Sequence, residues 1–146
     1  MPKKPRAAEP GIGVLLKRAE QAMVKSKNVA LKPVGLTLAQ YVALGELERQ
    51  PGITAATLAR ACFVSPQAIM ILLKSMEQQG LVARVAHARH ANVLELHMTA
   101  VGREALHAAR AEIGPVERRV ADAFSAKEMA TFRSLLARFV DAIDAG

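Results

Sequence analysis

The sequence predicts a mainly α-helical chain that carries one small β-hairpin. Hydrophobic residues make up 51% of the 146 residues and aromatic residues only 3%, a balance that favours helices over a β-sandwich. Along most of the chain, apolar residues recur with the 3.6-residue period of an α-helix. Between Gly80 and Thr99 this period changes to two, where short runs of branched residues flank a polar turn.

The chain is long enough to form one domain with its own core. Residues 1–11 hold three prolines, two lysines and one arginine without an apolar period, so we expect a flexible basic tail before a single domain over 12–146. The run of Lys3, Lys4 and Arg6 is either a solvated tail or an arm that contacts phosphates. No segment has the length of a membrane span or the pattern of a signal peptide. We therefore expect a cytoplasmic protein with no membrane partner.

Two helices are predicted in the first third of the chain. Apolar residues from Ile12 to Ala30 form a helical stripe, and Lys32-Pro33-Val34-Gly35 ends it. Thr37 has the hydroxyl of a helix cap, and Pro51-Gly52 ends the helix that it opens.

A short helix and a strongly marked helix follow. Thr54 caps the short helix. At Ser65-Pro66 a hydroxyl cap precedes a proline at the first helical position, where the missing N–H costs nothing. Gly80 ends this helix because glycine readily adopts a left-handed conformation. The predicted buried stripe of the second helix consists of Ile69, Leu72, Leu73 and Met76.

The β-hairpin is predicted from residues 81–86 and 93–98, with a polar tip from His87 to Asn92. Alternate residues of a strand point to the same face, so one face of the second strand should be buried. That face consists of Leu94, Leu96 and Met98.

The last third of the chain is predicted to be helical. Thr99 caps a long helix, in which Gly114-Pro115 predicts a kink or a break because proline removes a backbone hydrogen bond. Ser125 and Glu128 form a capping box that opens the final helix. Its apolar stripe consists of Met129, Phe132, Leu135, Leu136, Phe139 and Ile143. The terminal helices carry more apolar surface than they can bury alone, which predicts a homodimer.

The order helix, short helix, capped helix and β-hairpin is typical of a winged helix-turn-helix. Residues 36–98 would be the reading head, flanked by dimerisation helices over 12–35 and 99–146. In this motif the second helix enters the DNA major groove. The residues predicted to contact double-stranded DNA are Thr54, Ser65, Pro66, Gln67, Ala68, Met70, Ile71 and Lys74 in the helices, and Arg84, His87, Arg89, His90 and Asn92 in the wing.

A set of short motifs carries a resemblance to a known family. They are Leu36-Thr37-x-x-Gln40-Tyr41, Pro51-Gly52-Ile53-Thr54, Leu58-Ala59, Val64-Ser65-Pro66-Gln67, Gly80-Leu81-Val82-x-Arg84, Thr99-x-x-Gly102, and Ser125-x-x-Glu128 with Leu135-Leu136. From about Leu36 to the C-terminus, the chain resembles the MarR family of bacterial regulators. The resemblance implies an obligate dimer held by the first helix and the last two. It also implies repression or activation relieved by a small, often phenolic ligand between the dimer helices and the reading head.

The sequence departs from the MarR pattern in two places. The family usually has Asp-x-Arg at the wing tip, where this chain has His90 and Asn92. Ala68, Met70 and Ile71 replace polar or basic residues on the helix that faces DNA. Apolar side chains can touch a thymine methyl group but cannot form the bidentate hydrogen bonds that discriminate bases.

The sequence allows two alternative roles each for the tyrosine, the cysteine and the hairpin histidines. Tyr41, the only tyrosine, is either a core residue or a ligand contact if a pocket exists. The single cysteine, Cys62, is an oxidant sensor or a buried thiol, and the lack of adjacent basic residues favours the thiol. The histidines of the hairpin bind a metal or belong to a solvated loop, and no local carboxylate or cysteine completes a metal site. We expect no metal and no cofactor.

The charge distribution leaves two functions open. The chain has a net charge of +7, most of which lies in residues 1–35, with eight lysines and arginines and two glutamates. The first hypothesis is a dimeric regulator that binds DNA and a small-molecule effector. The alternative is a MarR-like module that binds a small molecule or protein and has weak or lost DNA binding. No nucleophile–base pair or phosphate-binding glycine loop indicates an enzyme.

Overall fold

The computed structural model describes residues 8–90 and 92–146, and most of the predicted basic tail, residues 1–7, lies outside them. The elements in chain order are α1 (Ile12–Leu31), the 3-10 helix η1 (Lys32–Val34), α2 (Leu38–Arg49), α3 (Ala55–Ala61), α4 (Pro66–Gln78), β1 (Val82–Ala86), β2 (Leu94–Met98), α5 (Ala100–Asp122) and α6 (Ala126–Asp144). The prediction of a mainly helical fold with one β-hairpin is confirmed.

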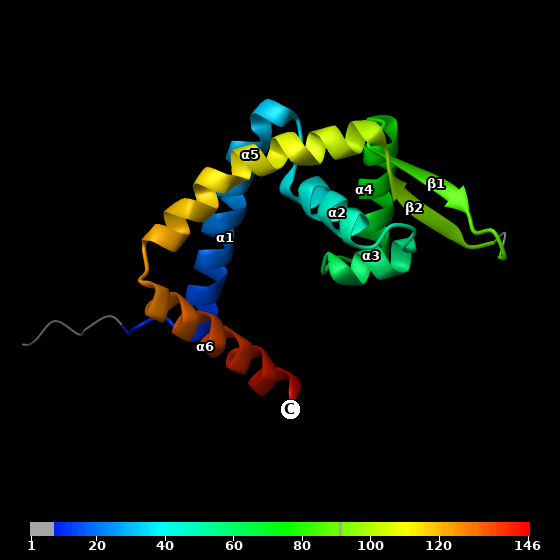
Figure 1. Cartoon of the computed structure of the whole chain (residues 1–146). Helices are drawn as coiled ribbons and strands as arrows, with labels where there is room; N and C mark the ends of the chain where they lie inside the picture. Colours follow the sequence, from blue (N-terminus) through cyan, green and yellow to red (C-terminus); the bar gives the residue numbers. More distant parts are fainter. Residues whose placement is uncertain (1–7, 91) are drawn as a thin grey trace, which may run out of the picture.

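The chain has two parts joined by its longest helix. Helices α2, α3 and α4 gather beside the hairpin on one side of Figure 1, and α1 and α6 lie on the other side. Helix α5 runs between them and contacts α1, α2 and β2. A displacement of α5 would therefore be transmitted to both parts.

Five helices begin at the hydroxyl caps that the sequence predicts. In each, the side-chain oxygen accepts a hydrogen bond from the backbone N–H three residues later, at 3.0–3.2 Å. A cap of this kind stabilises a helix by about 1 kcal/mol. The five caps are Thr37, Thr54, Ser65, Thr99 and Ser125.

One core fills the space between α2, α3, α4, the base of the hairpin and α5. The predicted inner stripe of α4 lies in it, with Ile69, Leu73 and Met76 fully buried and Leu72 partly buried. The other fully buried large side chains are Leu31, Leu44, Leu47, Leu58, Leu96, Leu106 and Ile113. Because these residues come from α1, α2, α3, α4, β2 and α5, the core holds the central helices and the hairpin against α1 and α5.

The hairpin is attached to the core at its base and middle, but not towards its tip. Strands β1 and β2 are antiparallel, with Val82 opposite Met98 at the base and Ala86 opposite Leu94 towards the tip. Leu96 is buried, but Leu94 is 45% exposed, so the prediction of a wholly buried leucine face is wrong. The reason is position, because Leu94 lies on the part of the hairpin that extends past the core.

Thr99 and Gly102 form the junction between the hairpin and α5. The Thr99 hydroxyl donates a hydrogen bond to the carbonyl oxygen of Gly80 at 2.6 Å. A Cβ atom on Gly102 would lie only 2.1 Å from the carbonyl oxygen of Leu81. The Thr99-x-x-Gly102 motif therefore allows α5 to start directly against the end of the α4–β1 turn.

Helix α5 continues through Pro115. It is one helix from Ala100 to Asp122, so the predicted alternative of a break is wrong. The ribbon bends over its second half in Figure 1, as expected where proline removes one backbone hydrogen bond. Ile113 and Val116, on either side of the proline in sequence, are both buried, so α5 packs against the core through this region.

Helix α6 has no buried residue, although one of its faces is apolar. Leu135 is 50% exposed, and Phe132, Val140 and Ile143 are similarly open to solvent.

Among the described residues, no single helix is both long and apolar enough to cross a membrane. Helices α3 and α4 meet that criterion only as a pair, bent by 106°.

Candidate nucleic-acid interface

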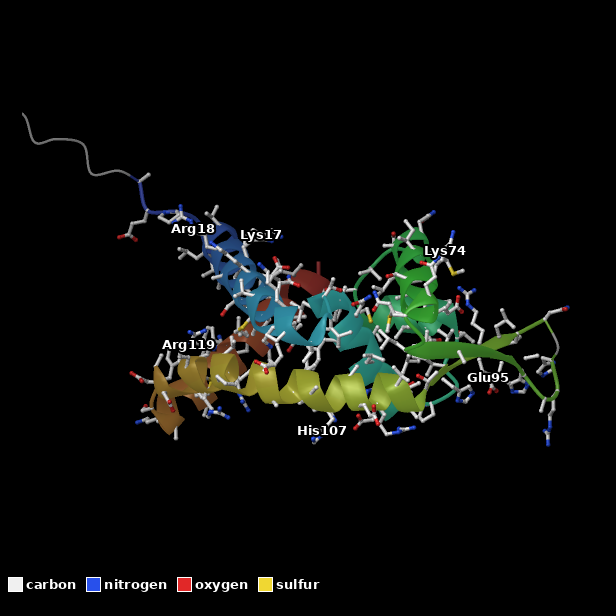
Figure 2. The ribbon with its side chains drawn as sticks, turned by 90° about the horizontal axis from the view of Figure 1, so that it is seen from above. Lys17, Arg18, Lys74, Glu95, His107 and Arg119 are labelled. Atoms are coloured by element: carbon white, nitrogen blue, oxygen red, sulfur yellow. The ribbon has the colours of Figure 1, made fainter. Side chains whose placement is uncertain are left out.

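The outer face of α4 combines four predicted DNA contacts. Gln67, Met70, Ile71 and Lys74 are spaced i, i+3, i+4 and i+7, so they share one helix face. All four are exposed, with Met70 at 42% and Ile71 at 74%. Figure 2 shows Lys74 directed away from the body of the molecule. The buried stripe on the opposite side of α4 sets this orientation.

The N-terminus of α4 is suited to a phosphate. The Ser65 hydroxyl accepts a hydrogen bond from the N–H of Ala68 at 3.1 Å, and Pro66 occupies the first helical position. Ser65, Pro66 and Ala68 are all exposed. The positive end of a 13-residue helix dipole therefore lies at an open surface, where it favours an anion.

The turn between α3 and α4 contains a residue that the sequence did not single out. Phe63 has φ of +55°, the only positive φ at a non-glycine residue among those described, and its side chain is 96% exposed. The N–H of Phe63 donates to the Arg60 carbonyl and that of Val64 to the Ala59 carbonyl. This is a Schellman motif, in which the left-handed position is usually glycine.

The end of α4 has the same motif with the expected residue. There the N–H of Gly80 donates to the Glu77 carbonyl and that of Leu81 to the Met76 carbonyl, and Gly80 has φ of +72°. A left-handed conformation costs an L-residue roughly 1–2 kcal/mol. The left-handed backbone of Phe63 therefore costs conformational free energy, and no burial of its ring within the described residues compensates for that cost.

The predicted DNA contacts of the wing lie in two places, near α4 and at the tip of the hairpin. Arg84 forms an ion pair with Glu77 of α4, so it links the hairpin to the reading helix instead of lying at the tip. Arg89, His90 and Asn92 are exposed at the tip. His90 stacks on His87, with ring centroids 5.4 Å apart.

Glu95 organises two histidines of the wing. Its two carboxylate oxygens lie 3.4 Å from Nε2 of His87 and 3.1 Å from Nε2 of His97. The position of Glu95 on the hairpin is visible in Figure 2. Within residues 8–90 and 92–146, no three histidine, cysteine or acidic side chains form a group that could hold a metal ion.

A groove brings four predicted site residues together. Thr54, Met70, Arg84 and Asn92 line one depression of about 440 Å³ between α3, α4 and the hairpin. The remaining lining residues are Ala55, Ala56, Val93, Leu94 and Leu96. Leu94 was expected in the core and instead belongs to this surface. The alternation of strand residues could not reveal this, because it gives the face but not the extent of the core.

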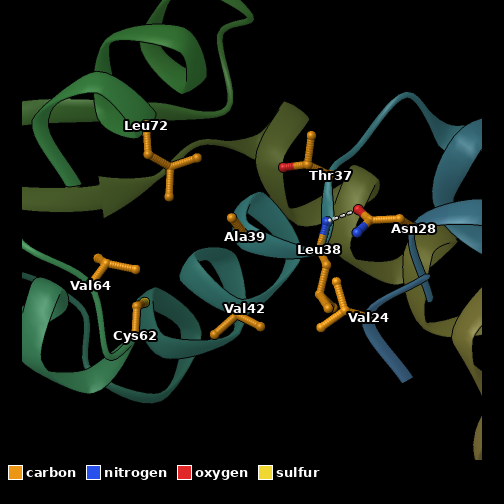
Figure 3. A pocket seen from close by; sticks show the side chains of 9 residues that line it. All are labelled: Val24, Asn28, Thr37, Leu38, Ala39, Val42, Cys62, Val64 and Leu72. Carbon is orange, nitrogen blue, oxygen red and sulfur yellow. Dashed lines mark hydrogen bonds between the residues drawn. The ribbon is translucent and has the colours of Figure 1, made fainter. Parts of the chain in front are cut away.

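A second, larger pocket of about 600 Å³ lies between α1, α2 and the α3–α4 turn (Figure 3). Its lining consists of Val24, Asn28, Thr37, Leu38, Ala39, Val42, Cys62, Val64 and Leu72. Among the described residues, no charged side chain lines it. Asn28 Oδ1 accepts a hydrogen bond from the N–H of Leu38 at 2.9 Å, which ties α1 to the start of α2. Tyr41, the predicted ligand contact, does not line this pocket and packs against the core.

Cys62 lines the same pocket and is partly buried. Burial, followed by the Glu46 carboxylate, raises the pKa of this thiol above its ordinary value. The neutral form therefore dominates near pH 7, which disfavours the sensor function that was left open.

Comparison with known proteins identifies the family. The sequence model of the MarR family matches residues 34–91. The HTH-type transcriptional repressor Rv2887 of Mycobacterium tuberculosis is 34% identical over 125 residues, which is 86% of this chain and 90% of that protein. The chain belongs to the MarR family. The resemblance seen in the sequence is confirmed.

Solved structures of a MarR family relative match nearly the whole chain. The crystal structure of Rv2887 in complex with salicylic acid is 33% identical with a TM-score of 0.72, and the match covers 92% of this chain and 99% of that one. The structure of Rv2887 in complex with DNA is 32% identical with the same TM-score, over 90% and 98% of the two chains. The MarR winged helix-turn-helix fold is therefore shown for this chain.

Proposed function

We propose that this MarR family chain is a transcription repressor that binds double-stranded DNA as a homodimer in the cytoplasm and has no enzymatic activity. The outward face of α4, next to a capped and exposed helix N-terminus, is the observation that carries this proposal. The relative Rv2887, named a transcriptional repressor and crystallised with DNA, supports it. The reading head is residues 36–98, and residues 12–35 and 99–146 are the dimerisation helices.

The apolar face of α6 supports the dimer. Exposed apolar residues at the start of α1 and along α6 have no partner within the described part of the chain that covers them. Symmetric pairing with a second copy would bury both sets. It would also place two copies of α4 about one DNA turn apart, at roughly 34 Å.

Binding to DNA from the region upstream of its own gene tests this function. In a fluorescence anisotropy titration, we expect saturable binding that weakens as salt rises, because lysine–phosphate contacts release counterions. Lys74→Ala should weaken binding and lower the salt slope by about one. Lys32→Ala, the same charge change on η1, is the matched control. If no complex forms at low salt, the chain is instead a binding module without DNA function.

We further propose that the 600 Å³ pocket holds the effector, and that the effector is a small neutral aromatic compound. The pocket lies between α1 and the reading elements, where a ligand can change their relative position. The described residues that line it supply hydrocarbon, one amide and two small polar groups but no cation. An ionised carboxylate would lose its hydration there without gaining a charged partner.

Two ligands of matched shape test the effector class. Salicylic acid, which the relative binds in its crystal structure, is anionic near pH 7, and salicylamide has the same ring without that charge. We expect salicylamide to release DNA at lower concentration than salicylate. Ala39→Phe, which fills the pocket, should abolish the response while Ala39→Ser keeps it. Equal potency of the two ligands would refute the neutral class.

A further inference from the structure

The outer face of α4 has polar ends and an apolar centre. Gln67 and Lys74 lie at the two ends, and Met70 and Ile71 lie between them. Ile71 is 74% exposed, and within the described chain neither the wing nor another helix covers it. An isoleucine this exposed at the centre of the outer face of α4 would be stabilised by contact with an apolar group of a partner.

The dimensions of this face match a short stretch of duplex. At 1.5 Å per residue, the seven steps from Gln67 to Lys74 span about 10 Å, which is roughly three base pairs at 3.4 Å each. The polar ends would therefore contact the edges of a three-base-pair window. Met70 and Ile71 would lie over its centre, where they can donate no hydrogen bond.

Only one base presents an apolar group in the major groove. Thymine carries a 5-methyl group there, whereas adenine, guanine and cytosine offer hydrogen-bonding edges at the same depth. We propose that Ile71, assisted by Met70, selects thymine at the centre of each half-site through contact with its methyl group. This proposal rests on the proposed DNA-binding function and names the base that the reading surface prefers.

The surroundings of Ile71 favour DNA over a protein partner. Its face is bordered by Lys74 and by the exposed helix start at Ser65. These groups suit phosphates and hydroxyl-rich surfaces. Two apolar side chains are too few for the apolar centre of a protein–protein interface, which requires about 800 Å² on each partner.

Uracil substitution isolates the methyl group. The preferred operator is first selected from a random duplex pool with the full chain. Each thymine of one half-site is then replaced by deoxyuridine, which pairs identically but lacks the methyl group, and binding is followed by fluorescence anisotropy. Loss of one buried methyl contact should weaken binding about fourfold at one or two adjacent positions and leave the other positions unchanged.

Variants assign that loss to Ile71. With Ile71→Ala, the selected operator should bind more weakly, and the thymine and uracil duplexes should then bind equally. Val101→Ala, at an exposed valine of α5, should keep the full fourfold difference. A cytosine placed at the sensitive position should regain affinity when it carries a 5-methyl group.

The outcomes distinguish failure of thymine selection by Ile71 from failure of the proposed DNA binding. Selective loss at uracil that vanishes in Ile71→Ala supports thymine reading. A chain that selects a defined operator but binds thymine and uracil duplexes equally keeps its DNA function and overturns the proposal. Recovery of no enriched duplex overturns the DNA function itself, and the reading mechanism with it.

Discussion

Helices α4 and α6 are both amphipathic, but the apolar face of α4 is buried and that of α6 is exposed. The apolar face of α4 packs against α2, α3 and β1, and Leu73 at its centre has no exposed surface. The apolar face of α6 is covered by nothing within the described residues, and its Leu135 is half exposed. Helix α4 is therefore stabilised by its own chain, whereas the apolar face of α6 is the surface that the proposed homodimer would cover.

The largest expected effect is on α6. Leu135→Asp should raise the dimer dissociation constant at least a hundredfold, because each of two subunits loses roughly 1.5–3 kcal/mol of apolar burial and gains a charge at the interface. Sedimentation velocity measures this change. Ser134→Asp, on the opposite side of α6, is the control and should remain dimeric. An unchanged association state for Leu135→Asp would contradict the assignment of this face to the dimer.

A change within α4 should act on folding of the chain itself. Leu73→Ala removes a fully buried side chain and should lower the free energy of unfolding by roughly 2–5 kcal/mol. Urea denaturation followed by circular dichroism measures the loss. Lys74→Ala, one residue further on and exposed, should change stability by less than about 0.5 kcal/mol. Equal effects of the two variants would contradict the orientation of α4.

The turn that leads into α4 offers a stabilising change. Phe63→Gly relieves the left-handed strain and loses no intramolecular burial, so the free energy of unfolding should rise by about 1 kcal/mol. Gly80→Ala, at the equivalent position of the next turn, should lower stability by a similar amount. A loss of stability in Phe63→Gly would mean that the ring is buried by a partner.

The smallest expected effect concerns Cys62, behind the same turn. Its raised pKa predicts slow alkylation by iodoacetamide at pH 7.5 relative to free cysteine, with the rate still rising above pH 9. Because the folded state disfavours the thiolate, this residue contributes stability at neutral pH that declines above about pH 8.5, the usual thiol pKa. Glu46→Gln should shift the alkylation profile towards lower pH. A fast reaction at pH 7.5 would restore the sensor hypothesis.

Much of the fold could be predicted because its signals are local. A cap such as Ser65 acts on an N–H three residues away, and the inner stripe of α4 follows from the helical period alone. The exposed reading face, including Ile71, follows from the same period. The predicted positions of these side chains needed no knowledge of distant residues.

Other features could not be predicted because they depend on contacts between distant segments. Arg84 was predicted to contact DNA from the wing, and the sequence did not show that the fold places the Glu77 carboxylate against it. Tyr41 was predicted to be either a core residue or a ligand contact; it packs against the core, and the 600 Å³ pocket is assembled from α1, α2 and the α3–α4 turn without it. Neither the ion pair nor the pocket has a pattern within a single segment.

The sequence by itself determined where each helix begins, which side of α4 is buried and which family the chain resembles, since hydrogen bonds and periodicity within a few residues decide these points. Only the tertiary structure decided that α5 continues through Pro115, that Leu94 is exposed beyond the core and that Phe63 adopts a left-handed conformation. At Pro115, packing between distant elements outweighs a local preference of about 3 kcal/mol, whereas Leu94 is exposed because the core does not extend as far as its position on the hairpin.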